Sequence, residues 1–362
     1  MNRLGQKIAR LVETSGPISV ADYMAICLFD PADGYYTTRD PFGAGGDFVT
    51  APEISQMFGE LVGAWLVAAW HALGRPVPVT LAEIGPGRGT MMKDVIRTVG
   101  RLAPDLGHGA SFALVEASPR LAALQKETLR DIGARLDWFE SLDAVPAGPL
   151  LVACNELFDA LPFRQFVRQD GRWLERAVGL DDAGGFRFVA GTATLEPGAL
   201  PPDADQAPEG SIFEIAPARD ALMDLIAGRL VGQGGAGIFF DYGHLRPGFG
   251  DTFQAVSRHG FARVLESPGA ADLTSHVDFD ALASVARAHG LAAHSATQGE
   301  FLLAMGLLQR AGQLGAPLDE AGRAKISADV DRLAGPGAMG ELFKVLAILP
   351  AGVPAAGFPG AS

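Results

Sequence analysis

Hydrophobic and polar positions alternate along the chain with two periods, and the first of them is helical. Apolar residues recur every three or four positions over 4–12, and the same spacing returns over 19–29 and 54–73. The segment 34–52 between the last two is rich in glycine, aromatic side chains and hydroxyls, unlike a plain linker. We therefore expect residues 1–76 to form a helical N-terminal extension that carries a glycine-rich loop.

The first helical segment has a second interpretation. Arg3, Lys7 and Arg10 lie between its apolar residues, as in an amphipathic transit segment. The pattern nevertheless ends near Gly16-Pro17 and continues directly into further patterned sequence. This continuity favours the first helix of the domain.

From residue 77 onward, short apolar runs alternate with helical segments. This alternation predicts an α/β fold with a mostly parallel sheet. We expect the core to span residues 77–350 and a flexible tail to occupy 351–362. The runs that predict strands are 79–85, 111–117, 136–139, 149–156, 236–243 and 343–349, and those that predict helices are 90–99, 118–130, 216–231, 279–289, 301–314 and 319–333.

Residues 163–215 interrupt the alternation of strands and helices. Strand-like patterning surrounds Asp170-Gly171, a pair of residues typical of a hairpin turn. A polar loop with proline follows at 203–210. We expect this block to be a β-rich insertion within the core.

Composition narrows the class of protein. The 362 residues include 29 Lys and Arg against 42 Asp and Glu, a net charge of −13, which argues against a broad face for nucleic-acid phosphate. A hydrophobic content of 48% excludes wholesale disorder. Cys27 and Cys154 cannot form a disulfide framework, and the 7 histidines lack metal-ligand spacing, so we expect no metal site. The apolar stretch 61–73 is too short to span a membrane.

The most informative motif is LAEIGPGRGT, at residues 81–90. Gly85, Gly87 and Gly89 follow a predicted strand and precede a predicted helix, a position in which bare main chain can approach a ligand. Glu116 ends the next strand, where a carboxylate can accept both hydroxyls of a ribose.

Three ligands compete for this motif. A dinucleotide loop needs a third glycine where Thr90 stands, and a phosphate loop needs a lysine that is missing. The form E-x-G-x-G-x-G, with Glu83 inside the strand, suits S-adenosylmethionine, which carries no phosphate. A glycine-rich turn without a ligand and an NADP site that uses Arg88 remain open.

A second polar motif, NELFDALP, begins where the fourth predicted strand ends. Ligands of open α/β sheets lie at this edge, so Asn155, Glu156 and Asp159 are candidates for the reacting centre. Helix capping and turn chemistry are the alternative, above all for Asp159. His244 follows the fifth strand and either lines the same cleft or belongs to a structural turn. Cys154 lies in an apolar strand and is expected to be a core residue.

Nine segments of the chain together resemble the MidA family, which contains the mitochondrial complex I assembly-factor arginine methyltransferase and bacterial relatives. The resemblance runs from about residue 18 to residue 350. The segments are GYYTTRDPFGAGGDFVTAPEISQMFGE, LAEIGPGRGT, LVEAS, NELFDALPFRQFV, FFDYGH, DTFQAV, ADLTSHVDF, TQGEFLL and AMGELFKVL.

The resemblance implies a Rossmann-like class I methyltransferase: a seven-stranded, mostly parallel sheet whose last strand is antiparallel. It implies S-adenosylmethionine as methyl donor and a protein arginine as acceptor, giving symmetric ω-dimethylarginine, with a complex I peripheral-arm subunit as one acceptor protein. The cofactor motif is carried by Glu83, Gly85, Gly87, Gly89 and Glu116, and the acceptor motif by Asn155, Glu156, Asp159 and Pro162.

From these roles we expect Glu156 and Asp159 to clamp the guanidinium, with Asn155 orienting it. The resemblance also places Asp47, Thr50 and Glu53 on a loop that closes over the site. A small-molecule methyltransferase, an assembly chaperone that retains the fold, and an NADP oxidoreductase are the alternatives. We expect a cytoplasmic bacterial protein, or a mitochondrial matrix protein if eukaryotic, and a homodimer is possible.

Overall fold

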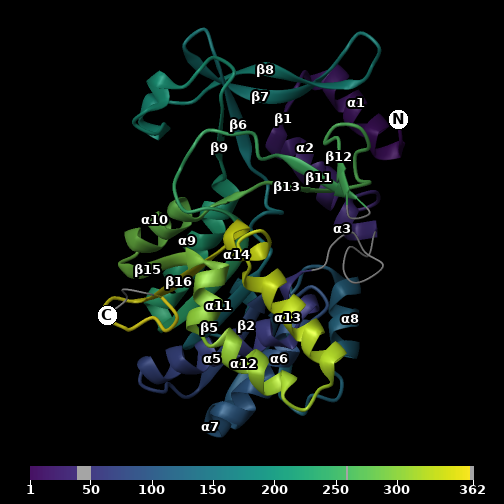
Figure 1. The fold of residues 1–362 in the computed structure, drawn as a ribbon. Coiled ribbons are helices and arrows are strands. Elements are labelled where there is room, and N and C mark those ends of the chain that lie inside the picture. The colour runs from purple at the N-terminus through teal and green to yellow at the C-terminus, as the bar shows by residue number, and fades with distance from the viewer. Residues whose placement is uncertain (39–49, 258–259, 359–362) are drawn as a thin grey trace. The chain divides into compact units, whose positions relative to one another are not determined.

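The short apolar runs of the sequence lie side by side in one sheet of the computed structural model, which describes residues 1–38, 50–257 and 260–358. The strand order is β15-β16-β10-β5-β2-β3-β4, and β14 adds a short pairing to β10. The strands from β10 to β4 are parallel, whereas β16 is antiparallel to both of its neighbours (Figure 1). The predicted mostly parallel sheet with an antiparallel last strand is therefore confirmed.

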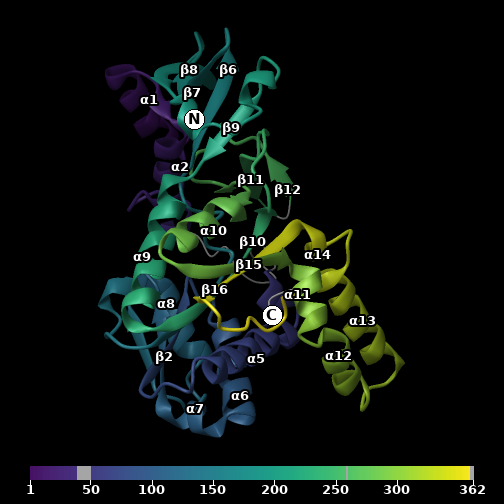
Figure 2. The same cartoon turned by 90° about the vertical axis from the view of Figure 1, so that its left-hand side faces the viewer.

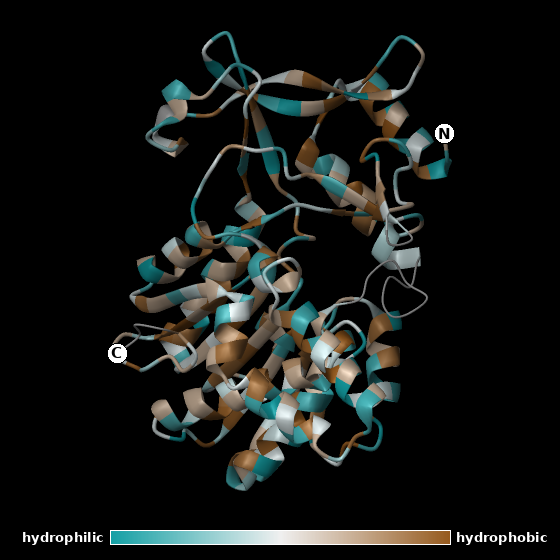
Figure 3. Cartoon of the chain, in the orientation of Figure 1, coloured by the Kyte–Doolittle hydropathy of each residue, from teal (hydrophilic) through white to brown (hydrophobic). Residues whose placement is uncertain are grey.

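The strands of this sheet are short and their buried residues are largely apolar. Every residue of β5 is buried, as expected for a strand covered on both faces. Figure 3 shows hydrophobic residues along the strands of this sheet. The bounds are β2 Val79–Ile84, β3 Ala110–Val115, β4 Leu136–Phe139, β5 Leu150–Asn155, β10 Gly235–His244, β14 Val277–Asp278, β15 Leu291–Thr297 and β16 Phe343–Pro350.

Helices cover both faces of the sheet, with α5 and α6 on one side and α10 on the other (Figure 2). Helices α5 and α6 approach closely because glycines face the contact. A Cβ on Gly59 would lie 2.7 Å from Cβ of Asp94, and one on Gly63 would lie 3.1 Å from Cβ of Thr98. The bounds are α4 Ala51–Ile54, α5 Gln56–Ala72, α6 Thr90–Leu102, α7 Pro104–Gly109, α8 Pro119–Thr128, η1 Leu142–Ala144, α10 Phe279–Ala288, α11 Gln298–Ala304, α12 Leu307–Gly315, α13 Glu320–Ala334 and α14 Met339–Leu342.

A second set of elements has its own sheet, of order β1-β7-β6-β9 with β8 paired to β7, and a smaller sheet of order β12-β11-β13. The hairpin predicted at Asp170-Gly171 connects β6 to β7. The bounds are α1 Arg3–Ser15, β1 Ile18–Ser19, α2 Val20–Phe29, α3 Tyr35–Thr38, β6 Arg164–Gln169, β7 Arg172–Leu180, β8 Phe186–Thr194, η2 Pro197–Ala199, η3 Ala204–Gln206, β9 Ile212–Ile215, β11 Gln254–Ser257, β12 Gly260–Ala262 and β13 Asp272–Thr274.

The chain divides into two compact units, each built from three separate segments of the sequence. The boundary between two of these segments lies within α9, Pro217–Gln233. The N-terminal helices share a unit with the β-rich insertion because β1 pairs with β7 and α1 and α2 pack in one core with Phe163 and Val178. Unit 1 comprises Met1–Phe48, Phe158–Leu222 and Arg246–His276, and unit 2 comprises Val49–Leu157, Met223–Leu245 and Val277–Ser362. The boundaries predicted from the sequence, at 1–76, 77–350, 163–215 and 351–362, follow a different division and stay predictions.

No helix in the described part of the chain has both the length and the hydropathy needed to cross a membrane. Within the same residues, no group of three or more His, Cys, Asp or Glu side chains is arranged to hold a metal ion.

Candidate cofactor and acceptor site

The glycine motif forms a tight turn between β2 and α6. Gly85, Gly87 and Gly89 have φ values of 66°, 53° and 83°, which residues with a Cβ rarely adopt. The N–H of Gly89 donates to the carbonyl of Pro86 at 2.7 Å and closes the turn. The predicted glycine loop thus lies where the carboxyl end of a parallel strand meets the start of a helix.

Gly85 brings the glycine loop next to the acceptor motif. A Cβ on Gly85 would lie 3.0 Å from Cδ1 of Leu157, the residue after Glu156. The approach follows from the sheet, because β2 and β5 are parallel neighbours with Ile84 paired to Cys154. The two motifs, distant in sequence, therefore share one edge of the sheet.

Glu83 is a buried carboxylate at the end of β2, with 3% of its surface exposed. Burial raises its pKa to about 8, although the N–H of Met92 donates to it and lowers the pKa in part. Its Oε2 atom has no hydrogen-bond partner among the described residues. A buried carboxylate oxygen without a donor favours a ligand group that brings one.

Glu116 follows β3, and both of its carboxylate oxygens accept hydrogen bonds. Oε1 accepts from the N–H of Ser118 at 2.8 Å, and Oε2 accepts from Nε2 of Gln125 at 3.1 Å. Burial raises the pKa of Glu116, and these donors oppose the rise. The sequence predicted Glu116 but gave no sign of Gln125, because an amide on an amphipathic helix has no motif.

Asn155 and Glu156 end β5 as predicted. Glu156 has φ of 51°, a conformation that costs a residue with a Cβ about 1 kcal/mol. Its N–H donates to the carbonyl of Phe240 at 2.9 Å, and its Oε1 accepts from Nδ2 of Asn155 at 3.1 Å. Oδ1 of Asn155 is buried with no hydrogen-bond partner among the described residues.

Asp241, on the neighbouring strand β10, holds the segment after Glu156. Its Oδ2 accepts from the N–H of Leu157 at 3.2 Å, and its Oδ1 accepts from the N–H of Tyr242 at 3.0 Å. Asp241 is fully buried. Both of these hydrogen bonds come from main-chain N–H groups, so Asp241 supports the turn at Glu156 from the next strand.

Two of the three residues predicted on the closing loop lie within the described residues. Thr50 precedes α4, and Glu53 lies within it. Oε1 of Glu53 accepts a hydrogen bond from Oγ1 of Thr90, at the start of α6, and the N–H of Ala51 donates to Oε1 of Glu156 at 3.4 Å. Helix α4 therefore contacts both the glycine loop and the acceptor motif. Asp47 lies outside the described residues.

The other half of the acceptor motif, Asp159 and Pro162, belongs to unit 1. The carbonyl of Asp159 accepts from the N–H of Ser275 and from Nη2 of Arg219, each at 3.2 Å. In the same unit the hydroxyl of Tyr36 donates to Oδ2 of Asp272 at 2.9 Å. Burial and the carboxylates of Asp272 and Asp159 raise the pKa of Tyr36.

His244 lies at the end of β10 beside Asp278, with 3.9 Å between Nδ1 and Oδ1. His244 and Asp278 are paired residues at the ends of the neighbouring strands β10 and β14. The predicted role of His244 at the acceptor stays a prediction. Cys154 is fully buried in β5.

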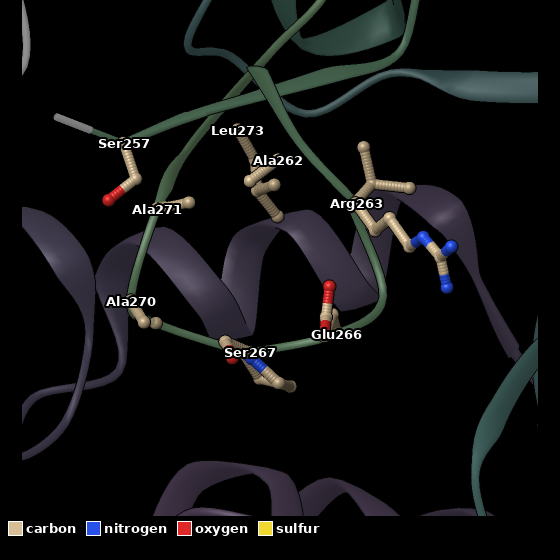
Figure 4. Close-up of a pocket in the computed structure, with 11 residues that line it drawn as sticks. Ser257, Ala262, Arg263, Glu266, Ser267, Ala270, Ala271 and Leu273 are labelled. Atoms are coloured by element: carbon tan, nitrogen blue, oxygen red, sulfur yellow. The ribbon is translucent and has the colours of Figure 1, made fainter. Parts of the chain in front are cut away.

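A small cavity of about 180 Å³ lies in unit 1 beside the sheet β12-β11-β13 (Figure 4). Arg263 and Glu266 are the charged residues of its lining. Binding sites for organic cofactors usually measure about 300 Å³ or more. None of the site residues that the sequence predicts is among its described lining residues.

Comparison with known proteins agrees with the cofactor that this geometry favours. Residues 61–297 match the model of a family described as "Putative S-adenosyl-L-methionine-dependent methyltransferase". The chain belongs to this family of S-adenosylmethionine-dependent methyltransferases. The predicted methyltransferase activity and S-adenosylmethionine as its cofactor are thereby confirmed.

Individual relatives extend the likeness over most of the chain. The zebrafish (Danio rerio) protein arginine methyltransferase NDUFAF7, mitochondrial, is 35% identical over 364 residues, which cover 94% of this chain and 86% of the relative. The mouse (Mus musculus) protein of the same name is 36% identical over 370 residues, covering 94% and 82%. A protein from Burkholderia thailandensis described as a "likely methyl transferase", crystallised with S-adenosyl-homocysteine, is 28% identical with a TM-score of 0.81, covering 99% of this chain and 93% of that one. The predicted family resemblance is confirmed.

Proposed function

We propose that this methyltransferase transfers the methyl group to arginine side chains of a protein. The observation that carries the proposal is Glu156, a carboxylate held at φ of 51° where β5 ends. A strained residue with a carboxylate side chain, at the edge of an α/β sheet where ligands bind, is typical of a functional site. The relatives in zebrafish and mouse, which are named protein arginine methyltransferases, support the same acceptor.

The residues at the glycine loop fit S-adenosylmethionine. Glu83 offers a buried oxygen without a donor, the glycines expose main chain, and Glu116 offers carboxylate oxygens at the end of β3. We infer that Glu83 and Gly87 hold the methionine portion and that Glu116 accepts from the ribose hydroxyls. When bound, the cofactor supplies a methyl group activated on a positively charged sulfur.

The chain's own residues would have to orient a guanidinium and accept its proton. Free guanidinium is protonated and a poor nucleophile, because its pKa exceeds about 12. A carboxylate on the nitrogens that do not react holds the positive charge away from the reacting nitrogen. That nitrogen would accept the methyl group, with the bonding electrons left on the cofactor's sulfur, and a carboxylate of this chain would take the proton that the nitrogen releases.

We assign the carboxylate contact to Glu156, with Asn155 orienting it through the hydrogen bond from Nδ2. Asp159, predicted as the second carboxylate of the clamp, and Pro162 keep these roles as predictions from the sequence. Thr50 and Glu53 are proposed to close over the acceptor, and Glu53 is tied to the cofactor side through Thr90.

The test is transfer of a labelled methyl group from S-adenosylmethionine to proteins of an extract that lacks this enzyme. Glu156→Gln is expected to reduce labelling by about 100-fold or more, the size of a lost acid–base contact, while cofactor affinity is kept. Glu127→Gln, at an exposed position on α8, is the matched control. Full labelling by Glu156→Gln would contradict the assignment.

Analysis of the labelled product separates the other candidate functions. Label in ω-N-methylarginine after protein hydrolysis supports the proposal, and its pattern shows whether two methyl groups are placed symmetrically. Label in small molecules alone would assign a small-molecule methyltransferase. Cofactor binding without transfer to any acceptor would assign a chaperone that retains the fold.

The acceptor protein expected from the family resemblance is a core subunit of the peripheral arm of respiratory complex I. We propose such a subunit, or its bacterial equivalent, as the first acceptor to test with purified protein. A cytoplasmic or matrix location and a homodimer stay predictions.

A further inference from the structure

A buried amide on α8 connects the two parts of the proposed cofactor site. Gln125 is fully buried, and Nε2 donates to the carbonyl of Gly87 at 2.9 Å and to Oε2 of Glu116 at 3.1 Å. Its Oε1 accepts from Nε1 of Trp138 at 3.0 Å. The amide therefore makes hydrogen bonds to three different structural elements from one side chain.

Trp138 fixes which way the amide of Gln125 points. An indole N–H is a donor only, so it selects the amide oxygen and leaves the NH₂ group for Gly87 and Glu116. The opposite orientation would set the amide oxygen against a carbonyl and a carboxylate. Trp138 on strand β4 therefore ensures that the NH₂ group of Gln125, and not its oxygen, faces Gly87 and Glu116.

The consequence for Glu116 is a carboxylate that is oriented before any ligand arrives. One oxygen accepts from Ser118 and the other from Gln125. A carboxylate oxygen can accept more than one hydrogen bond, so each keeps capacity for a hydroxyl donor. A group that is already oriented loses less conformational freedom on binding, which increases affinity.

We propose that Gln125 is a positioning residue for S-adenosylmethionine: it fixes Gly87 and Glu116 relative to each other so that the methionine portion and the ribose are bound in one register. The inference rests on the ribose role proposed for Glu116. It concerns a residue that contacts the cofactor-binding groups rather than the cofactor.

The experiment measures affinity by calorimetry for two ligands, S-adenosylhomocysteine and its analogue without the ribose 2′ and 3′ hydroxyls. We expect Gln125→Leu to weaken binding of S-adenosylhomocysteine about tenfold, the loss of roughly one to two net hydrogen bonds. The deoxy analogue should lose less, about twofold, because only the hydrogen bond to Gly87 beside its methionine portion affects it and it has no ribose contact for Glu116 to orient. A merely structural role would weaken both ligands equally, and that result would overturn the proposal.

Three further variants complete the test. Trp138→Phe keeps Gln125 but frees its orientation, and it should show the same ligand discrimination at smaller size, which keeps the proposal testable if Gln125→Leu fails to fold. Glu127→Gln, at an exposed position on the same helix as Gln125, is the control and should change neither affinity. Glu116→Gln tests the underlying role: unchanged affinity for S-adenosylhomocysteine would reject the ribose contact itself. Weaker binding by Glu116→Gln with normal binding by Gln125→Leu and Trp138→Phe would reject the role of Gln125 alone.

Discussion

The guanidinium of Arg219 donates from Nη2 to the backbone carbonyl of Asp159 at 3.2 Å, although 60 residues separate the two in sequence. Arg219 is buried, with 3% of its surface exposed, and it also donates to the carbonyl of His276 at 2.7 Å and to Oγ of Ser275 at 2.5 Å. The buried guanidinium of Arg219 thus joins two segments of unit 1 by donating to main-chain carbonyls of both. One of these segments carries a residue of the acceptor motif.

Arg219→Met is expected to lower the free energy of unfolding by about 3 kcal/mol or more, because several buried acceptors lose their donor at once. Arg229→Met is the matched control, since Arg229 donates to the carbonyls of Leu142 and Pro146 from a half-buried position and should cost about 1 kcal/mol. Urea unfolding followed by fluorescence and circular dichroism measures both. Equal losses in the two variants would contradict the role of burial at Arg219.

Glu156→Gly should abolish methyl transfer and lower stability only slightly, through the lost hydrogen bonds from Asn155 and Ala51 to Oε1. Glycine adopts the φ of 51° found at Glu156 freely, so the gain from relieved strain, about 1 kcal/mol, offsets the larger chain entropy of an unfolded glycine. The measurement pairs urea unfolding with transfer of labelled methyl groups. A variant that is both inactive and strongly destabilised would indicate that the side chain supports the fold.

Gly87→Val should prevent cofactor binding. A β-branched residue is strongly disfavoured at the φ of 53° found at Gly87. In the role proposed for Gly87, the valine side chain would also occupy the space of the methionine portion. We expect affinity for S-adenosylhomocysteine to fall by about 100-fold or more, equivalent to roughly 3 kcal/mol. Gly100→Val in α6 is the control, because a Cβ there meets no atom within 4 Å. Calorimetry that finds unchanged affinity in Gly87→Val would refute the assignment.

The stability of the protein without cofactor should fall as the pH rises from 4.5 to 8. Burial raises the pKa of Glu83 from 4.5 to about 8, so in this range the folded protein binds a proton that the unfolded chain has lost. The contribution is complete below pH 4.5 and is lost as the pH passes the folded value, by at most about 1.4 kcal/mol per pH unit.

Glu83→Gln isolates this contribution because it removes the titrating group and keeps the shape. Urea unfolding at several pH values should show a shallower fall in stability for the variant than for the natural protein. Parallel curves for the two proteins would mean that Glu83 does not titrate between the folded and unfolded states.

The sequence by itself determined those features of the structure that depend only on residues near one another in the chain. The strand and helix periods, the turn formed by Gly85, Gly87 and Gly89, and the polar motif after β5 are local features, and the structure has most of them where the pattern predicts them. Two differences are that the helix expected over 301–314 is divided into α11 and α12 at Gly306, and that the pattern did not predict β15. The physical reason is that side-chain periodicity and the freedom of glycine act within a few residues. The family resemblance supplied the antiparallel position of β16.

Only the tertiary structure decided which distant groups meet. Gln125 lies 38 residues from Gly87, and no motif links them. Asp241 receives the N–H of Leu157 because β10 and β5 are neighbours, and β1 joins the β-rich insertion because it pairs with β7. Buried polar groups need hydrogen-bond partners, and the fold supplies these partners from distant parts of the chain. A pattern of neighbouring residues therefore cannot predict which groups will pair.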